Sequence, residues 1–341
     1  MAGEKVRIGI IGLGHRGHCF AEIYHKNPKA ELVAIADPSE QRRTEVGRGL
    51  GIPEDRRYPG FEILEREDID MISIHMPDHL HAESFIKAIN TGRHIFVESP
   101  MADSLSDIRR MLDAWRGTEL KVMVGHVLRF NPYFRMLKEM LVEGILGRIF
   151  YMEADYIHNL RQKVEPGRSS LGLDMEWSPQ TGISIVRYGV YPFDLIRWYA
   201  GSRPTEVQVF SNHIAFPEME HDDCTVAIFR FENGCIAKIA VCLGAIAPFA
   251  RYNNMTIYGT KGSIIRDKLC LKGFGAKEVA LPDVYEQGYP YDLEVDHFLD
   301  CILQDRRPLV DALDGANSAA AIIMVEEAVR LRKSVNIPWF E

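Results

Sequence analysis

The chain lacks any long hydrophobic run. None of the apolar stretches in its 341 residues approaches the roughly 18 residues that a membrane-spanning helix needs. The first residues, Met1–Lys5, contain no apolar core of the kind found in a signal peptide. We therefore expect a cytoplasmic protein with no membrane partner.

An excess of positive charge is also missing. The 40 Lys and Arg residues are outnumbered by 48 Asp and Glu residues, which leaves a formal net charge of −8. Such a surface repels the phosphates of nucleic acids and anionic lipids. We expect no nucleic acid partner, and a small molecule as the ligand.

Cysteine is present, but not in any metal-binding or disulfide pattern. The six cysteines form no C-x-x-C pair and lie mostly in apolar runs. Buried thiols in a reducing cytoplasm explain this better than disulfides or a metal site. We predict no metal, and the sequence shows no constellation for serine or cysteine nucleophile chemistry.

A glycine-rich segment, Gly12–Gly17, directly follows the apolar run Val6–Ile11. In a dinucleotide site the first glycine permits the tight turn, the second lets the backbone approach the pyrophosphate, and the third lets the helix pack closely. Asp37 stands twenty positions after Gly17, at the end of a second apolar run. Its carboxylate is placed to bind ribose hydroxyls and to repel a 2′-phosphate, so we predict NAD rather than NADP. The alternative is an ordinary glycine-rich turn.

Strand-like and helical segments alternate through the first part of the chain, which predicts an α/β fold with a Rossmann-type parallel sheet. The expected strands are 6–11, 31–36, 71–76, 94–98 and 121–124, and the expected helices after the first are 40–50, 81–90 and 104–116. Ligands gather at the carboxyl ends of such strands. The glycine segment, Asp37, Met76–His81 and Glu98–Met101 should therefore converge on one cleft.

The pattern changes after residue 126. Longer alternating segments indicate an α+β domain with a large, mostly antiparallel open sheet, and Asn233-Gly234 predicts a hairpin between 225–231 and 235–242. We expect residues 1–125 to form the NAD-binding domain and 126–341 the substrate-binding and oligomerisation domain. One face of this second sheet should be free for a partner subunit.

From Val6 to about Pro338 the chain resembles the Gfo/Idh/MocA family, named after glucose–fructose oxidoreductase and inositol dehydrogenase. The residues that carry the resemblance are Met76–Glu83, Gly92–Pro100, Arg129–Pro132, Gly182–Trp198 and Tyr258–Gly262. The resemblance implies a nicotinamide cofactor, a sugar or cyclitol substrate, and homodimers or homotetramers joined through the open face of the second sheet.

The resemblance also implies how the cofactor is held. Met76, Pro77 and His79 would line the nicotinamide, with His81 nearby, and Glu98 would hold its ribose. Helix capping and solvation are the alternative for the two histidines. The full expected set is Gly12, Leu13, Gly14, His15, Arg16, Gly17, Asp37, Met76, Pro77, His79, His81, Glu98 and Ser99.

The chain departs from the family pattern at three polar positions. It has Ser99 where the family usually has the lysine of Glu-Lys-Pro, and Arg187 and Tyr191 where the family shows Asp and His. We predict that Tyr191 accepts the substrate proton and that Arg187, one helical turn earlier, supplies the missing cation. The alternative is that Arg187 pairs with an acid such as Asp194 or Glu176 and that Tyr191 only packs.

Four residues are expected to bind the substrate: Arg129, Arg161, Trp177 and Asp194. Arg161 suits a carboxylate or phosphate on the substrate. A structural ion pair is the alternative for Arg129, and a plain surface charge is the alternative for Arg161.

Together these features predict an NAD-dependent oxidoreductase acting on a secondary hydroxyl or ketone of a sugar, sugar derivative or cyclitol. A lyase or glycosidase that oxidises its substrate transiently with bound NAD is one alternative. A non-catalytic NAD-binding sensor is the other.

Overall fold

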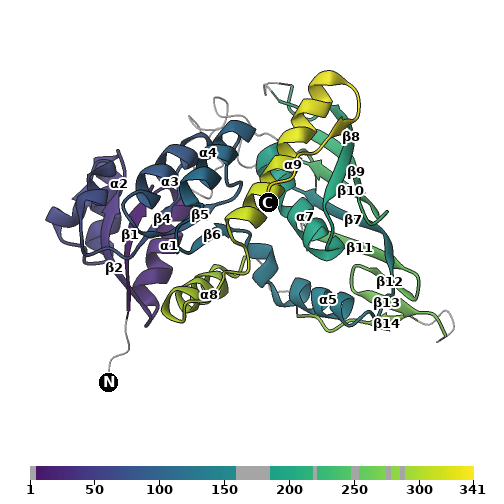
Figure 1. The fold of residues 1–341 in the computed structure, drawn as a ribbon, viewed down its shortest axis with the longest axis horizontal. Coiled ribbons are helices and arrows are strands. Elements are labelled where there is room, and N and C mark those ends of the chain that lie inside the picture. Colours follow the sequence, from purple (N-terminus) through teal and green to yellow (C-terminus); the bar gives the residue numbers. More distant parts are fainter. Residues whose placement is uncertain (1–4, 159–184, 218–220, 247–252, 274–277, 285–288) are drawn as a thin grey trace. The chain divides into compact units, whose positions relative to one another are not determined.

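The computed structural model describes residues 5–158, 185–217, 221–246, 253–273, 278–284 and 289–341, which form two compact units (Figure 1). The first unit combines the chain up to Val127 with Pro290–Ala319, and the second combines Leu128–Tyr289 with Ala320–Phe340. The chain first passes between units two residues after the expected boundary at 125. The sequence assigned 290–319 to the second domain, whereas the structure places them in the first.

Specific contacts hold residues 290–319 in the first unit. The Val124 amide donates to the Val310 carbonyl at 3.0 Å, and Lys29 pairs with Asp296 at 3.0 Å and with Asp300 at 2.7 Å. These partners are far apart in sequence, so no local pattern revealed the return of the chain.

The first unit contains a six-stranded parallel sheet with the order β3-β2-β1-β4-β5-β6. Its strands are β1 (Val6–Ile11), β2 (Ala30–Ala36), β3 (Arg57–Tyr58), β4 (Met71–Ile74), β5 (His94–Glu98) and β6 (Val122–Gly125). The strand order reverses between β1 and β4, where such sheets bind their ligands. The predicted Rossmann-type sheet is confirmed.

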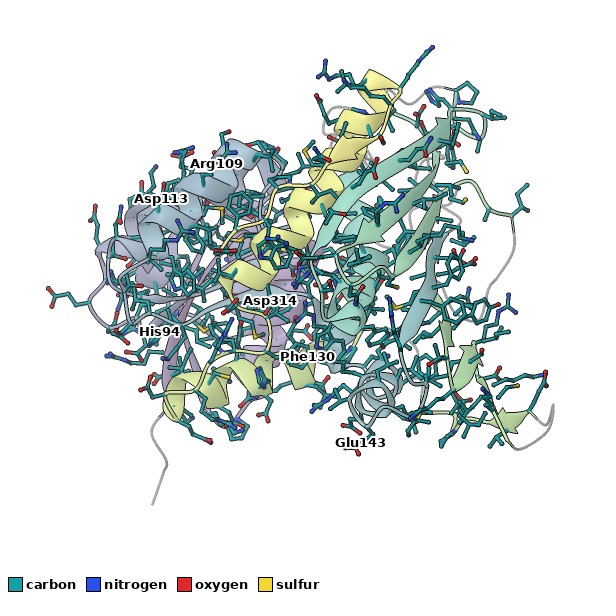
Figure 2. All side chains as sticks on the ribbon, turned by 45° about the vertical axis from the view of Figure 1, so that its right-hand side comes forward. His94, Arg109, Asp113, Phe130, Glu143 and Asp314 are labelled. Carbon is teal, nitrogen blue, oxygen red and sulfur yellow. The ribbon has the colours of Figure 1, made fainter. Side chains whose placement is uncertain are left out.

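The helices of this unit are amphipathic, and each buries one face. They are α1 (His15–Lys26), α2 (Glu40–Gly49), α3 (His81–Ile89), α4 (Leu105–Trp115) and α8 (Tyr291–Leu303). In α4, Ile108 and Met111 are buried, while Arg109 and Asp113 lie on the exposed face and point away from the sheet (Figure 2). Ser104 begins this helix by accepting a hydrogen bond from the Asp107 amide.

In the second unit, the described residues form a nine-stranded sheet with the order β14-β13-β12-β11-β7-β10-β9-β8-β15. Its strands are β7 (Ile149–Ile157), β8 (Pro204–Asn212), β9 (Cys224–Phe231), β10 (Ile236–Cys242), β11 (Asn253–Gly259), β12 (Gly262–Ile265), β13 (Lys268–Leu271), β14 (Val279–Ala280) and β15 (Val335–Asn336). Strands β7 and β10 run parallel, and the other described pairs are antiparallel. This confirms the predicted mostly antiparallel sheet.

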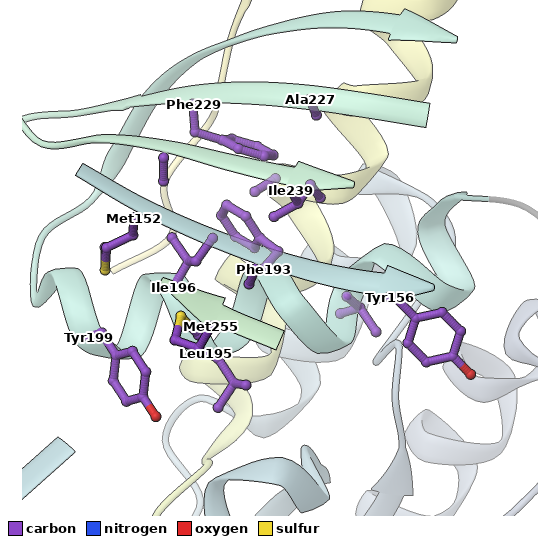
Figure 3. Close-up of a cluster of buried hydrophobic side chains, with 14 of the residues drawn as sticks. Met152, Tyr156, Phe193, Leu195, Ile196, Tyr199, Ala227, Phe229, Ile239 and Met255 are labelled. Atoms are coloured by element: carbon purple, nitrogen blue, oxygen red, sulfur yellow. The ribbon is translucent and has the colours of Figure 1, made fainter. Parts of the chain in front are cut away.

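The core of the second unit lies between this sheet and helix α7 (Ile185–Ala200). Figure 3 shows Phe193 and Ile196 of α7 among Phe229 and Ile239 of the strands, and the rings of Phe193 and Phe229 are 4.6 Å apart. Helix α7 continues through Pro192 without a break. Helix α5 (Pro132–Val142) belongs to the same unit, and α9 (Ala312–Leu331) runs from one unit into the other.

The opposite face of the sheet carries exposed apolar side chains, including Phe210, Ile228 and Ile236. The sequence predicts a partner subunit on this face, and that remains a prediction. Over the described ranges, no helix is both long and apolar enough to span a membrane.

Candidate functional site

The glycine loop between β1 and α1 has three different steric environments. Gly12 has φ of +94°, which favours glycine, and a Cβ atom on Gly17 would lie 1.8 Å from the Gly12 carbonyl oxygen. At Gly14, by contrast, nothing lies within 4 Å of a Cβ position. Gly14 is also the N-cap of α1 and provides no side-chain cap. The loop therefore leaves open space at the start of a helix, as an anion site requires.

Asp37 follows β2 and is fixed to this loop. Its Oδ2 accepts a hydrogen bond from the Leu13 amide at 2.7 Å, and its Oδ1 accepts one from the Ser39 amide at 2.8 Å. Arg42 Nη1 lies 4.0 Å from Oδ2, and the Asp37 side chain is only 4% exposed. The structure thus brings Asp37 and Leu13 together; both belong to segments that the sequence expected to meet at the carboxyl ends of the strands.

His81, the first residue of α3, links the loops that follow β4 and β5. Its ring nitrogens lie 2.8 Å from the Met76 carbonyl oxygen and 2.9 Å from that of Pro100, and the residue is buried. It therefore ties together two segments that the sequence assigned to the nicotinamide side. Pro77 precedes a short 3-10 helix, η3 (Asp78–Leu80), on which His79 is exposed; His15 is exposed at the start of α1.

Glu98, at the end of β5, is bound by two neighbours. Its Oε1 lies 3.2 Å from His75 Nδ1 and 3.5 Å from Arg16 Nε. Arg16 in turn hydrogen-bonds to the Tyr291 hydroxyl and lies over the Tyr291 ring, 4.4 Å from its centre. Burial raises the pKa of Glu98, but the hydrogen bond from His75 and the charge of Arg16 outweigh it and hold the pKa below its usual value.

His75 extends this pair into a buried hydrogen-bonded chain. Its Nε2 lies 2.7 Å from Ser73 Oγ, which lies 3.0 Å from the Tyr24 hydroxyl. A carboxylate only accepts, so Nδ1–H donates to Glu98, and the neutral ring then accepts from Ser73. Burial lowers the pKa of His75 despite Glu98, which favours this neutral ring. Sequence reasoning missed this series of hydrogen bonds, although Ser73 of β4 and His75, the residue after that strand, are two positions apart and so share one face of an extended segment.

Glu294 on α8 is a second carboxyl group near Glu98, and it is buried. The residue is 1% exposed, and neither carboxyl oxygen has a hydrogen-bond partner among the described residues. Burial raises its pKa well above the usual value; the charge of Glu98 adds to this, and Arg16 opposes it. Sequence reasoning missed Glu294 because residues 290–319 were assigned to the other domain.

Ser99 completes this end of the sheet. Its hydroxyl oxygen is buried and has no hydrogen-bond partner in the described part of the chain. A bound dinucleotide would give this hydroxyl group a hydrogen-bond partner, and it would fill the open space at Gly14. The residues present therefore fit NAD.

The second unit pairs two of the expected substrate residues with each other. Arg129 Nε and Nη2 each donate to Asp194 at 2.7 Å, and both side chains are 2% exposed. Arg197 Nη2 lies 3.7 Å from the same carboxylate. The structural ion pair, which was the alternative for Arg129, is therefore present.

Tyr191 belongs to an aromatic cluster, here called the tyrosine cluster, formed by Tyr156, Tyr188, Tyr191 and Tyr289. The Tyr191 ring stacks on Tyr156 and on Tyr289, with 5.8 Å between ring centres in each case. Burial, with the neighbouring phenols, raises the pKa of Tyr156 well above its usual value. Arg187 is partly exposed, one turn earlier on the same helix. Packing of Tyr191 is thus established, and its chemical role remains a prediction.

Two expected substrate residues, Arg161 and Trp177, lie outside the described residues. Where the structure does describe the chain, no group of three His, Cys, Asp or Glu side chains is arranged to hold a metal ion.

Two family models match the chain in sequence order. Residues 6–126 match an oxidoreductase family model for the NAD-binding Rossmann fold, and residues 134–265 match the GFO/IDH/MocA C-terminal domain. The first match confirms the predicted NAD-binding domain.

Individual proteins are similar over different lengths. The chain is 26% identical over 322 residues to scyllo-inositol 2-dehydrogenase (NAD(+)) of Bacillus subtilis, covering 91% of this chain and 90% of that one. It is 34% identical over 165 residues to a glycosyl hydrolase family 109 protein of Porphyromonas gingivalis, covering 46% and 35%. A structure of levoglucosan dehydrogenase with NADH and L-sorbose superposes with a TM-score of 0.86 at 21% identity, covering 99% and 100%.

Proposed function

The chain belongs to the Gfo/Idh/MocA oxidoreductase family, and from this premise we propose that it transfers a hydride between NAD and a secondary hydroxyl or ketone of a sugar, sugar derivative or cyclitol. The observation that carries the proposal is the similarity to an inositol dehydrogenase over 91% of the chain. The open glycine loop and the orphaned Ser99 hydroxyl agree with it.

Bound NAD supplies the hydride acceptor in this reaction. The amides of Gly12–Gly17 would bind its pyrophosphate, with His15 and Arg16 beside them. Asp37 would accept hydrogen bonds from the ribose hydroxyls, and its negative charge would disfavour a 2′-phosphate, which gives the preference for NAD. Residues at the ends of β4 and β5 would line the nicotinamide side: Met76, Pro77, His79, His81, Glu98 and Ser99.

Ser99 occupies the position where we expect the family lysine. Its hydroxyl retains a hydrogen-bond donor but brings no positive charge. The proton of the substrate hydroxyl therefore needs another acceptor, stabilised by another cation.

Tyr191 is our proposed proton acceptor. A phenol with an ordinary pKa of about 10 needs a nearby cation to accept a proton near neutral pH. Arg187 is four residues earlier on the unbroken helix α7, which puts both residues on one side of that helix. Arginine stays charged, so its role is to stabilise the phenolate and to orient the substrate.

In this proposal, Arg129 and Asp194 do not contact the substrate; they hold the site through the ion pair that they form. Asp194 is three residues after Tyr191 on α7, and Arg129 lies in the short helix η4 (Val127–Phe130) before α5. Their buried pair fixes α7 and thereby Tyr191. Arg161 and Trp177 remain proposed contacts to the substrate itself.

A second function is favoured by the glycosyl hydrolase family 109 relative, which has 34% identity over 165 residues. In that case the residues proposed to hold NAD would keep it bound, and it would supply a reversible uptake of hydride, so that no cofactor is consumed. A glycoside would then be cleaved without any net formation of NADH.

The test incubates the purified full chain with NAD and a panel of sugars, cyclitols and glycosides, and follows nicotinamide absorbance and glycoside cleavage together. Accumulating NADH supports the dehydrogenase. Cleavage without NADH supports transient oxidation. NAD binding with neither reaction across the panel contradicts both and favours a sensor.

A further inference from the structure

Two cysteines that are 18 positions apart face each other across neighbouring strands. Cys224 of β9 and Cys242 of β10 are direct partners in the antiparallel ladder, and their sulfur atoms are 3.3 Å apart. Both are free thiols and half-buried. Their proximity follows from the hairpin, because each residue before the turn pairs with one after it.

The strand register places these two side chains in the geometry that a disulfide needs. The next pair along the ladder is hydrogen-bonded, since the Leu243 amide donates to the Asp223 carbonyl at 3.0 Å. Hydrogen-bonded and non-hydrogen-bonded pairs alternate, so Cys224 and Cys242 form a non-hydrogen-bonded pair with Cα atoms about 4.5 Å apart. Disulfides span Cα separations of about 4.4 to 6.8 Å. Closure needs only the sulfurs to approach.

A small molecule can reach this pair. Both cysteines line a surface hollow of about 280 Å³ together with residues that include Asn212, Ile214 and Gly244. The dithiol is therefore open to solvent on one side and does not depend on unfolding of the sheet.

We propose that Cys224 and Cys242 form a dithiol site that reacts with small-molecule disulfides and closes to a cross-strand disulfide. The Cys224 sulfur loses its proton and attacks one sulfur of the external disulfide, which forms a mixed disulfide and releases one thiol. The Cys242 sulfur then loses its proton, attacks the Cys224 sulfur and releases the second thiol. Two protein thiols are oxidised, and one external disulfide is reduced to two thiols.

In the reduced pair, Cys242 holds its proton more tightly than an ordinary thiol does. Burial and the hydrogen bond with Cys224 raise its pKa to about 12, and the nearby carboxylates of Asp155 and Asp223 add to the effect. The two cysteines belong to β9 and β10 and are not among the residues proposed to bind NAD, so the proposal is independent of the proposed function.

The experiment uses the reduced full chain, with oxidised glutathione as the probe disulfide. Trypsin cleaves after Arg230 and Lys238, so the two cysteines fall in separate peptides, 198–230 and 239–251. Non-reducing peptide mapping should then show these peptides linked, with a mass lower by two hydrogens and no retained glutathione.

Three variants make the test specific. In Cys242→Ser, glutathione should remain on Cys224, because the closing step is lost. Cys224→Ser should prevent the linked peptide. Cys270→Ser is the matched control, since Cys270 is a half-buried strand cysteine that lies opposite Ser263. This variant should form the disulfide between Cys224 and Cys242 as the wild type does. The proposal is overturned if the wild-type protein keeps both thiols reduced or retains glutathione at either position. Both results are read from the wild-type protein, so they do not depend on the folding of a variant.

Discussion

His75 Nδ1 lies 3.2 Å from the Glu98 carboxylate and connects it, through Ser73, to a fully buried tyrosine. The chain of hydrogen bonds runs from α1 through β4 to the end of β5. Glu98 is therefore held by the interior of the first unit as well as by Arg16 at the glycine loop. Substitutions in this chain should affect stability and cofactor binding together.

Replacing His75 by leucine should destabilise the protein. The substitution removes one hydrogen bond to a charged carboxylate and leaves Ser73 without its acceptor, at a cost of roughly 2–3 kcal/mol. Urea unfolding measures the difference. His18→Leu is the control, because that histidine is half-exposed on α1; equal losses in the two variants would contradict the buried chain.

Glu294 should make stability fall as pH rises. The pKa of Glu294 is raised in the folded state, so the folded protein binds a proton here more tightly than the unfolded chain does. The stability that this proton contributes is complete below the unfolded pKa of about 4.3, and it is lost as the pH rises toward the folded pKa. Glu294→Gln should remove this loss. The variant should therefore gain stability relative to the wild type as pH rises above about 4.3, by at most ~1.4 kcal/mol per pH unit.

Urea unfolding across that range measures the gain, with the half-exposed Glu22→Gln as control. Glu98 acts in the opposite sense. Its pKa is lowered, so its contribution is lost only as pH falls below about 4.3, outside this window. A pH-independent difference between Glu294→Gln and wild type would show that Glu294 is not held protonated.

Breaking the buried pair of Arg129 and Asp194 should be costly. Asp194→Asn or Arg129→Met leaves an uncompensated charge in the core of the second unit, and such losses amount to roughly 3–5 kcal/mol. Arg203→Ala, which removes the exposed pair with Glu232, should change stability little. Thermal unfolding compares them. Similar shifts for the buried and the exposed pair would contradict the structural role of Arg129.

Gly14 and Gly17 should respond differently to alanine. At Gly17 the new methyl group collides with main chain, so Gly17→Ala should lower both Tm and NADH affinity. At Gly14 there is room for it, so Gly14→Ala should keep the Tm and weaken NADH binding by filling the cofactor space. NADH fluorescence titration and thermal unfolding test this. Unchanged NADH affinity in Gly14→Ala would place the dinucleotide elsewhere.

Tyr191→Phe should lower kcat by roughly 100-fold or more, because it removes the proposed proton acceptor, while NADH affinity stays unchanged. Tyr188→Phe is the matched control: Tyr188 also lies on α7 and also stacks on Tyr156. Steady-state kinetics on an accepted substrate provide the measurement. Equal losses in both variants would assign Tyr191 a packing role only.

The sequence determined the features that depend on local pattern and spacing. Apolar periodicity specified five of the six strands of the first sheet but not the two-residue strand β3. The glycine segment with Asp37 specified a nucleotide loop, because turn geometry and helix packing impose glycine at fixed positions. The Asn233-Gly234 turn specified the hairpin, since it requires a positive φ, which Gly234 adopts at +85°. The register itself, which sets Cys224 opposite Cys242, came only from the structure.

Only the tertiary structure decided which distant side chains meet. Residues 290–319 pack with the first unit, and this alone brings Glu294, whose carboxyl group has no hydrogen-bond partner among the described residues, near Glu98. Arg129 and Asp194 are 65 positions apart. Because both side chains are charged, the sequence was as compatible with substrate binding as with an ion pair. Burial decided between these roles, because a buried charge must be neutralised by a partner or by a proton, and the partner is selected by packing rather than by sequence spacing.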